Sequence, residues 1–216
     1  MARRSKMWVF LQFPLTRIVI AVVALTTLVG AIQVCAQALG VAPHSTASVF
    51  VAMLMMLATL AVYAGFVRLI ERRRVSELGL NGAALEFGSG FGIGAFLFAL
   101  TMVVLYALGQ VDITMAGGWE VLGLPLLDAL IAAVTEEVLM RGVLFRIVEG
   151  SLGSWIALVF SAALFGALHG FNPGATLTSS IAIALEAGVL LAAVFMYTRR
   201  LWMVIGLHTA WNFTEG

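Results

Sequence analysis

A group of polar residues in the carboxy-terminal half of the chain has the side chains needed for hydrolysis. Its members are Glu136, Glu137, Arg141, His169, His208 and Asn212. A carboxylate can remove a proton from water, and an imidazole can hold that water or carry the proton. A second imidazole and an amide can donate hydrogen bonds to a developing oxyanion. Because no Ser-His-Asp or Cys-His arrangement accompanies them, these groups predict amide hydrolysis without a covalent nucleophile.

The spacing of these residues predicts which of them face one another. Glu137 and Arg141 are four residues apart, so on a helix they share a face and can form an ion pair. Glu136 is rotated from Glu137 by about 100° and is free to face a cavity. His208 and Asn212 are also four residues apart and can point together at one site. A purely structural ion pair and packing histidines remain the alternative interpretation.

Zinc chemistry is the competing hypothesis for the same cluster. Glu136, His169 and His208 would form a site of two histidines and one glutamate with an open position, as in catalytic zinc sites. The chain has no His-Glu-x-x-His helix, and Asn212 is a poor zinc ligand. We therefore expect no metal cofactor, with zinc as the alternative.

Three further residues are weaker candidates. Phe165 precedes His169 by one helical turn and is an accessory candidate. Asp128 and Glu186 are single acids in apolar runs without a partner nearby in the sequence. We interpret both as structural or protonated groups, and Glu186 is retained as an accessory candidate.

Composition places this cluster in a membrane. Of 216 residues, 62% are hydrophobic and 11% are charged, and the mean hydropathy is +1.07. A soluble domain is about half apolar and about a quarter charged, and a spanning helix needs about 20 apolar residues. The chain is therefore expected to be an all-α, polytopic membrane helix bundle. Its net charge of +1 gives no indication of nucleic-acid binding.

The apolar runs predict about seven transmembrane helices. They cover residues 18–39, 48–70, 87–108, 121–148, 155–169, 177–197 and 201 onward. Every Lys and Arg except Arg141 falls on one side of this arrangement, and the loops 40–47, 109–120 and 170–176 contain none. The basic side is expected to be cytoplasmic, which places the amino terminus there. We divide the chain into a basic head, residues 1–17, and one transmembrane domain, residues 18–216, with a catalytic core at about 121–216.

A glycine-rich stretch in the third run, residues 88–94, has two possible interpretations. It lacks the preceding strand and the Lys-Ser/Thr pair of a phosphate-binding loop. Small residues four apart on a membrane helix are typical of a helix-packing face. We therefore predict close packing against another helix.

Three motifs together resemble a known family. They are Glu-Glu-x-x-x-Arg at 136–141, Phe-x-x-x-His at 165–169 and His-x-x-x-Asn at 208–212. In this order and on separate helices they are similar to the CAAX-processing and bacteriocin-processing (CPBP, or Abi) family of intramembrane endopeptidases. The resemblance covers roughly residues 124–216, and the segment 74–80 is similar to the loop before the family's core.

The resemblance implies a role for each motif. Glu136 and His169 would activate water, His208 and Asn212 would form an oxyanion hole, and Glu137 and Arg141 would orient them. The substrate would be a membrane-associated protein or peptide within the lipid bilayer, with no nucleic acid involved. The short chain and basic head favour a bacterial plasma membrane. A zinc-dependent protease, a non-catalytic scaffold or bacteriocin-immunity protein, and a small proton-coupled transporter are the alternatives.

Overall fold

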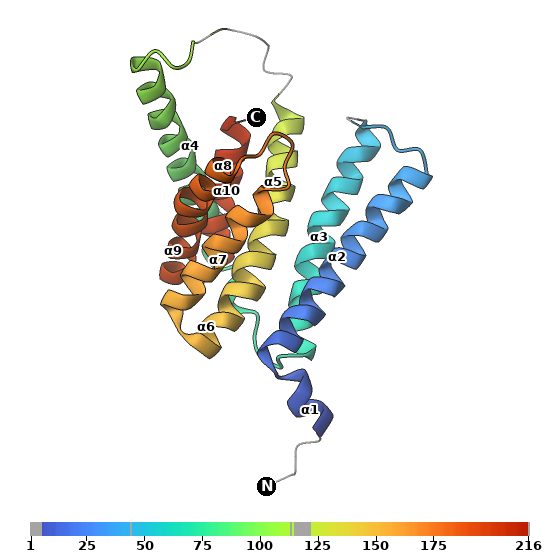
Figure 1. Ribbon diagram of the computed structural model, residues 1–216. Helices are drawn as coiled ribbons and strands as arrows, with labels where there is room; N and C mark the ends of the chain where they lie inside the picture. Colours follow the sequence, from blue (N-terminus) through green and yellow to red (C-terminus); the bar gives the residue numbers. More distant parts are fainter. Residues whose placement is uncertain (1–5, 44, 113, 115–121, 216) are drawn as a thin grey trace.

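The computed structural model describes residues 6–43, 45–112, 114 and 122–215, and these form helices and turns without a β-strand (Figure 1). The elements are α1 (Lys6–Leu11), α2 (Pro14–Ala38), α3 (Thr46–Leu69), the short 3-10 helix η1 (Ser76–Leu78), α4 (Ala83–Ala107), α5 (Gly123–Glu137), the π-helix η3 (Val138–Phe145), α6 (Arg146–Leu152), α7 (Ser154–His169), α8 (Leu177–Ile183), the π-helix η4 (Ala184–Gly188), α9 (Val189–Thr198) and α10 (Leu201–Glu215). The predicted all-helical membrane bundle is confirmed.

Four helices in the described part of the chain are long and apolar enough to cross a membrane. They are α2, α3, α4 and the helix formed by α8, η4 and α9. The segments α5, η3 and α6 follow one another directly from Gly123 to Leu152, and α7 is a shorter apolar helix. The count of seven spans and the cytoplasmic amino terminus stay predictions.

Element boundaries differ from the apolar runs mainly at helix starts. Helix α2 begins at Pro14, before the apolar run, because proline fits the first turn of a helix, where its missing N–H is not needed. Arg17 therefore lies on the helix. The predicted fourth helix contains the π-helix η3, whose hydrogen bonds are one residue longer than those of an α-helix. Such segments are frequent at functional sites.

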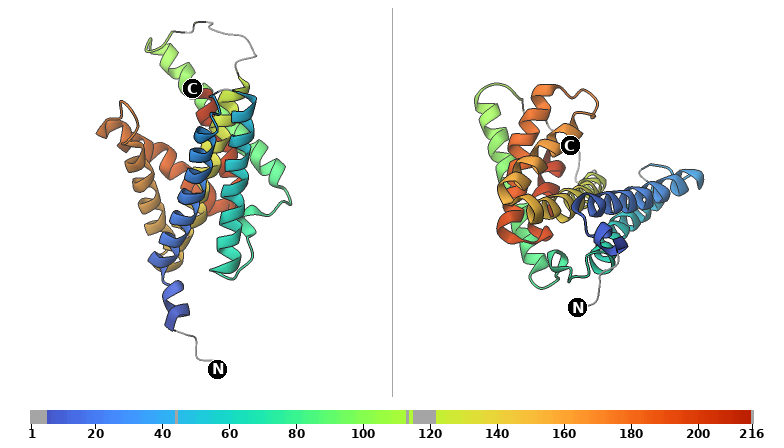
Figure 2. Two further views of the ribbon diagram at one scale, coloured as in Figure 1. Left: turned by 90° about the vertical axis from the view of Figure 1, so that its right-hand side faces the viewer. Right: turned by 60° about the horizontal axis from the view of Figure 1, so that its bottom comes forward.

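The bundle consists of a central group of helices and a hairpin at its side (Figures 1 and 2). Helix α10 packs against both α4 and α5, and α7 packs against α6, η3 and η4. Helices α2 and α3 pair with each other, and α3 packs against α5. The buried core is centred on η3, α6 and the first half of α10. The helix carrying Glu136 and Glu137 is therefore enclosed on several sides.

A network of charges fastens the base of the hairpin to the central helices. Glu71, 3% exposed, forms ion pairs with Arg17 at 3.2 Å, Arg73 at 3.0 Å and Arg146 at 2.8 Å. Arg73 also pairs with Glu77. Burial lowers the pKa of the Arg73 guanidinium, but the hydrogen bond and charge of Glu77 outweigh burial and raise it above its ordinary value. The network thus joins α2, the segment after α3 and α6.

Glycine allows α4 and α10 to approach backbone to backbone. A Cβ atom on Gly206 of α10 would overlap the carbonyl oxygen of Phe87, and one on Gly90 or Gly94 of α4 would overlap carbonyl oxygens of α10. A Cβ on Gly92 would meet nothing within 4 Å. The predicted packing face in residues 88–94 is thus confirmed for two of its glycines. This contact places His208 against α5.

We predict that Gly206→Ala destabilises the protein and that Gly92→Ala does not. The methyl group at residue 206 meets rigid backbone, and such overpacking costs about 1–3 kcal/mol. The methyl group at residue 92 enters open space. The measurement is the thermal unfolding midpoint of each purified variant in detergent. Equal midpoints for both variants would contradict this account of the α4–α10 contact.

Candidate active site

Three helices bring the predicted residues to one region of the bundle. Glu136 and Glu137 are the last residues of α5, and Arg141 lies in the π-helix η3 that continues it. His169 is the last residue of α7, and His208 lies in the middle of α10. The region therefore combines groups that are up to 72 residues apart in sequence.

The Glu137 carboxylate is fully buried in this region. It is 0% exposed, as is Arg141, whose Nη1 donates to Glu137 Oε1 at 2.9 Å. His208 Nδ1 lies 2.7 Å from the same oxygen. Arg141 Nη2 donates to the carbonyl oxygen of Gly188 at 3.1 Å, which ties η3 to η4. A fully buried carboxylate is thus held by one guanidinium and one imidazole.

The partners of the two histidines determine their tautomers. An ionised carboxylate and a backbone carbonyl can only accept hydrogen bonds. His208 Nδ1 faces the Glu137 carboxylate, and His169 Nδ1 lies 2.8 Å from the carbonyl oxygen of Phe165. We therefore assign a proton to Nδ1 of both rings. In the neutral form each Nε2 is then a hydrogen-bond acceptor.

Glu136 faces both of these Nε2 atoms. Its Oε2 lies 3.9 Å from Nε2 of His169 and 3.9 Å from Nε2 of His208. This oxygen is buried and has no hydrogen-bond partner among the described residues, although the side chain as a whole is 36% exposed. Two groups bridged by one water, with hydrogen bonds of about 2.7–2.9 Å, lie roughly 3.8–4.7 Å apart. The spacing therefore suits a water held between carboxylate and imidazole.

An apolar cavity of about 510 Å³ opens onto Glu136 and His169. Val22 and Thr26 of α2 form one wall, and residues of η3 and α7 form the opposite wall. Asn172, just after α7, also lines it. A cavity of this size can hold several residues of an apolar peptide beside the carboxylate.

The same residues do not form a fitting zinc site in this arrangement. Ligands of a tetrahedral zinc at about 2.0–2.2 Å lie roughly 3.3–3.5 Å from one another, closer than the two 3.9 Å separations from Glu136 Oε2. Across the described ranges, no group of three His, Cys, Asp or Glu side chains is placed to hold a metal ion. No catalytic step is therefore assigned to a metal.

Phe165 lies at the centre of the cluster. The Arg141 guanidinium carbon is 4.8 Å from the centre of its ring, which is a cation–π distance. The rings of His169 and His208 lie 4.5 Å and 5.8 Å from it, centre to centre. Phe165 thus packs against both histidines and covers the buried cation.

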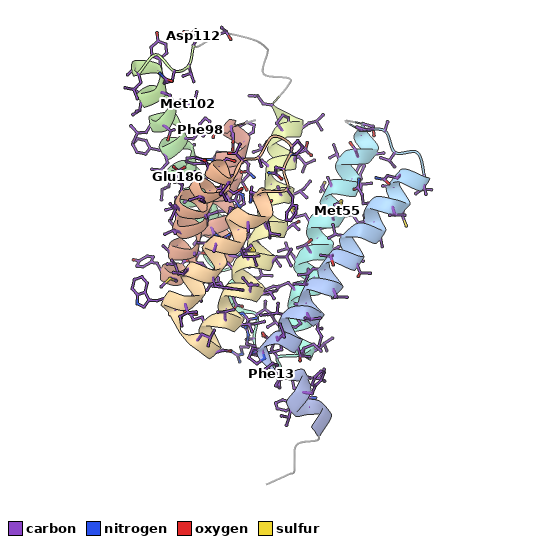
Figure 3. The ribbon with its side chains drawn as sticks, viewed as in Figure 1. Phe13, Met55, Phe98, Met102, Asp112 and Glu186 are labelled. Atoms are coloured by element: carbon purple, nitrogen blue, oxygen red, sulfur yellow. The ribbon has the colours of Figure 1, made fainter. Side chains whose placement is uncertain are left out.

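The remaining candidates lie at different distances from this cluster. Asn212 is one turn beyond His208 on α10 and is half-buried. Glu186 is exposed on η4, on the side of the bundle opposite the α2–α3 hairpin (Figure 3). Asp128 is exposed on α5, two turns before Glu136, and lines a different cavity. The structure does not bring Glu186 to the cluster.

Residues that the sequence did not single out complete the site. The Tyr63 hydroxyl of α3 donates to the carbonyl oxygen of Gly142 at 3.1 Å, inside the π-helix. Gly188 and Asn172 contribute a carbonyl group and a cavity wall. The sequence shows Tyr63 as a polar group within an apolar run and Asn172 as an amide just after the Phe-x-x-x-His motif, and these patterns could have indicated both residues. Nothing local in the sequence indicated Gly188.

We predict that Arg141→Met destabilises the protein more than the double variant Glu137→Gln/Arg141→Met. The single variant leaves the Glu137 carboxylate buried beside His208 without its guanidinium, and removing one partner of a buried pair costs about 3–5 kcal/mol. The double variant removes that charge. Thermal unfolding in detergent would measure both losses, and a double variant at least as unstable as the single one would contradict the pairing.

The comparisons with known proteins agree with the motifs. Residues 118–214 match the family model described as Rce1-like, Type II CAAX prenyl endopeptidase Rce1-like. The matched segment contains all six residues of the cluster, from Glu136 to Asn212. No curated protein and no solved structure matches the chain. The family match confirms the resemblance seen in the three motifs.

Proposed function

From the match of residues 118–214 to the Rce1-like type II CAAX prenyl endopeptidases, we propose that the protein is an intramembrane endopeptidase in which Glu136 activates water. The observation that supports this mechanism is the placement of Glu136 Oε2 at 3.9 Å from Nε2 of both His169 and His208. The substrate is a membrane-associated protein or peptide, and the cellular site is a bacterial plasma membrane. No nucleic acid takes part.

The first step is attack by water. A water between Glu136 Oε2 and His169 Nε2 donates one hydrogen bond to each, because His169 keeps its proton on Nδ1 toward Phe165. Glu136 takes a proton from the water as its oxygen bonds to the scissile carbonyl carbon. The carbonyl π electrons move to the oxygen, which gives a tetrahedral intermediate with an oxyanion.

The second step is stabilisation of that oxyanion by His208 and Asn212. The Glu137 carboxylate, 2.7 Å from His208 Nδ1, orients the ring, and His208 in its doubly protonated form donates from Nε2–H to the oxyanion. The Asn212 amide, one turn away on the same helix, supplies a second donor. Arg141 donates a hydrogen bond to Glu137 and so holds its carboxylate in place. The two histidines thus have different roles because one is paired with a carboxylate and the other with a carbonyl.

The third step is release of the amine. The proton that Glu136 took from water passes to the nitrogen of the scissile bond, the carbon–nitrogen bond breaks, and the oxyanion returns to a carbonyl. The products are a carboxylic acid and an amine, and Glu136 is again a carboxylate. No covalent intermediate with the protein forms, and no cofactor takes part.

We predict that Glu136→Gln abolishes cleavage and that Glu186→Gln does not. Removal of a general base costs about 10²–10⁴-fold in rate. Glu186 provides a matched control because it is exposed and outside the cluster. New peptide termini in membranes would be profiled by mass spectrometry in cells producing each variant or the wild type. Identical termini for wild type and Glu136→Gln would contradict proteolysis and favour a non-catalytic scaffold.

We predict that the activity does not depend on a metal. The purified full chain would be reconstituted in vesicles with a peptide spanning a cleavage site from that profile. Treatment with 1,10-phenanthroline followed by removal of the chelator should leave the rate unchanged, since water activation needs only Glu136 and His169. A loss that added zinc restores would overturn the glutamate mechanism in favour of the zinc-dependent alternative.

A further inference from the structure

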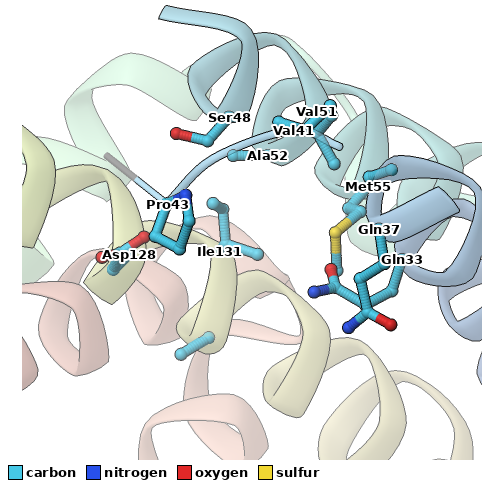
Figure 4. A pocket seen from close by; sticks show the side chains of 12 residues that line it. Gln33, Gln37, Val41, Pro43, Ser48, Val51, Ala52, Met55, Asp128 and Ile131 are labelled. Carbon is cyan, nitrogen blue, oxygen red and sulfur yellow. The ribbon is translucent and has the colours of Figure 1, made fainter. Parts of the chain in front are cut away.

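A second cavity lies on the same side of α5 as the active-site cavity. It has a volume of about 640 Å³ and is enclosed by α2, α3, the turn at 41–43 and α5 (Figure 4). Among the described residues that line it, Asp128 is the only charged side chain. Gln33 and Gln37 of α2 and Ser48 at the start of α3 add further hydrogen-bonding groups. Apolar side chains such as Met55 and Ile131 form the rest of the wall.

The two cavities follow the same faces of the same two helices. Asp128 and Ala132 of α5 line this cavity, and Glu136 of α5 and Met140 of η3 line the active-site cavity, so that successive residues are four positions apart. On α2 the wall passes from residues 33 and 37 to residues 22 and 26. Side chains at such spacing share one face of a helix. The hairpin is fastened at its base by Glu71 and diverges from α5 toward the opposite end (Figure 1).

Among the residues that the structure describes, Asp128 has no cationic partner. No ion pair or hydrogen bond of its carboxylate occurs among the described residues. In the sequence, the loops 40–47, 109–120 and 170–176 contain no Lys or Arg. An ionised Asp128 carboxylate can only accept hydrogen bonds, and the neighbouring glutamine amides and the Ser48 hydroxyl offer acceptor oxygens beside their donors, which suits a cationic group with several N–H donors.

We propose that this cavity is a specificity subsite in which Asp128 binds a Lys or Arg side chain of the peptide substrate. Asp128 lies about 12 Å from Glu136 along α5, since eight residues rise by about 1.5 Å each. An extended peptide advances about 3.3–3.6 Å per residue. The basic residue is therefore three or four residues from the scissile bond. This inference rests on the proposed protease function and defines its substrate more narrowly.

The first test compares the sequences around cleavage sites. Sites that depend on Glu136 would be collected for the wild type, Asp128→Asn, Asp128→Lys and the control Asp112→Asn, whose acid lies outside the cavity (Figure 3). The wild type and Asp112→Asn should show Lys or Arg enriched three or four residues from the cut. Asp128→Asn should lose this enrichment, and Asp128→Lys should replace it with Asp or Glu.

The second test measures the preference directly. Two peptides identical except for Lys or Gln at the enriched position would be cleaved by the full chain in vesicles. The wild type should cleave the Lys peptide about tenfold faster, as a charge-assisted hydrogen bond allows. Asp128→Asn should cleave both at the rate of the wild type on the Gln peptide, which also shows that the variant is folded. Asp128→Glu should keep the preference.

The outcomes separate this inference from the function on which it rests. In one outcome, cleavage depends on Glu136 but the residues around the cut are the same for the wild type and all Asp128 variants. This result would overturn the subsite and leave the protease function intact. It would assign the cavity to another occupant, such as the amine headgroup of a lipid. An absence of any Glu136-dependent cleavage would overturn both.

Discussion

The buried carboxylate of Glu137 is the interaction on which the rest of the site depends. It is fully enclosed, and one of its oxygens receives both Arg141 Nη1 and His208 Nδ1. A charge at this depth is tolerated only when it is paired and hydrogen-bonded. Because both donors must reach the same carboxylate oxygen, the pairing fixes the rotation of η3 and α10 relative to each other. It also fixes the tautomer of His208. Those constraints direct His208 Nε2 toward Glu136.

The surrounding helices can be understood as supports for this pairing. Helix α10 reaches α5 because glycines let it approach α4 closely, and η3 is held by Tyr63 from α3 and Gly188 from η4. Phe165 packs against the Arg141 guanidinium and both imidazoles. The Glu136 carboxylate, the proposed base, is left partly exposed beside a cavity. Two adjacent residues thus supply a buried, paired charge, Glu137, and a partly exposed carboxylate, Glu136.

Much of this could be predicted from the sequence because charges inside apolar runs are costly and therefore informative. The helical class and the pairing of Glu137 with Arg141 follow from hydropathy and spacing. The same spacing predicts that Glu136 is rotated away from this pair and faces a cavity. The π-helix could not be predicted, since Val138–Phe145 reads as an ordinary helical segment. The pairing of Glu137 with His208, 71 residues away, depends on how α5 and α10 pack. The cavity beside Asp128 depends on the divergence of two helices, which no local pattern encodes.

The central claim is that water, activated by Glu136, attacks the substrate directly. The most direct measurement is single-turnover cleavage of a peptide by the reconstituted protein in the presence of hydroxylamine, with the products analysed by mass spectrometry. The account predicts that the amino-terminal product is always the free carboxylic acid. A hydroxamate product would reveal an acyl-enzyme intermediate, and would contradict the assignment of Glu136 as the base that delivers water.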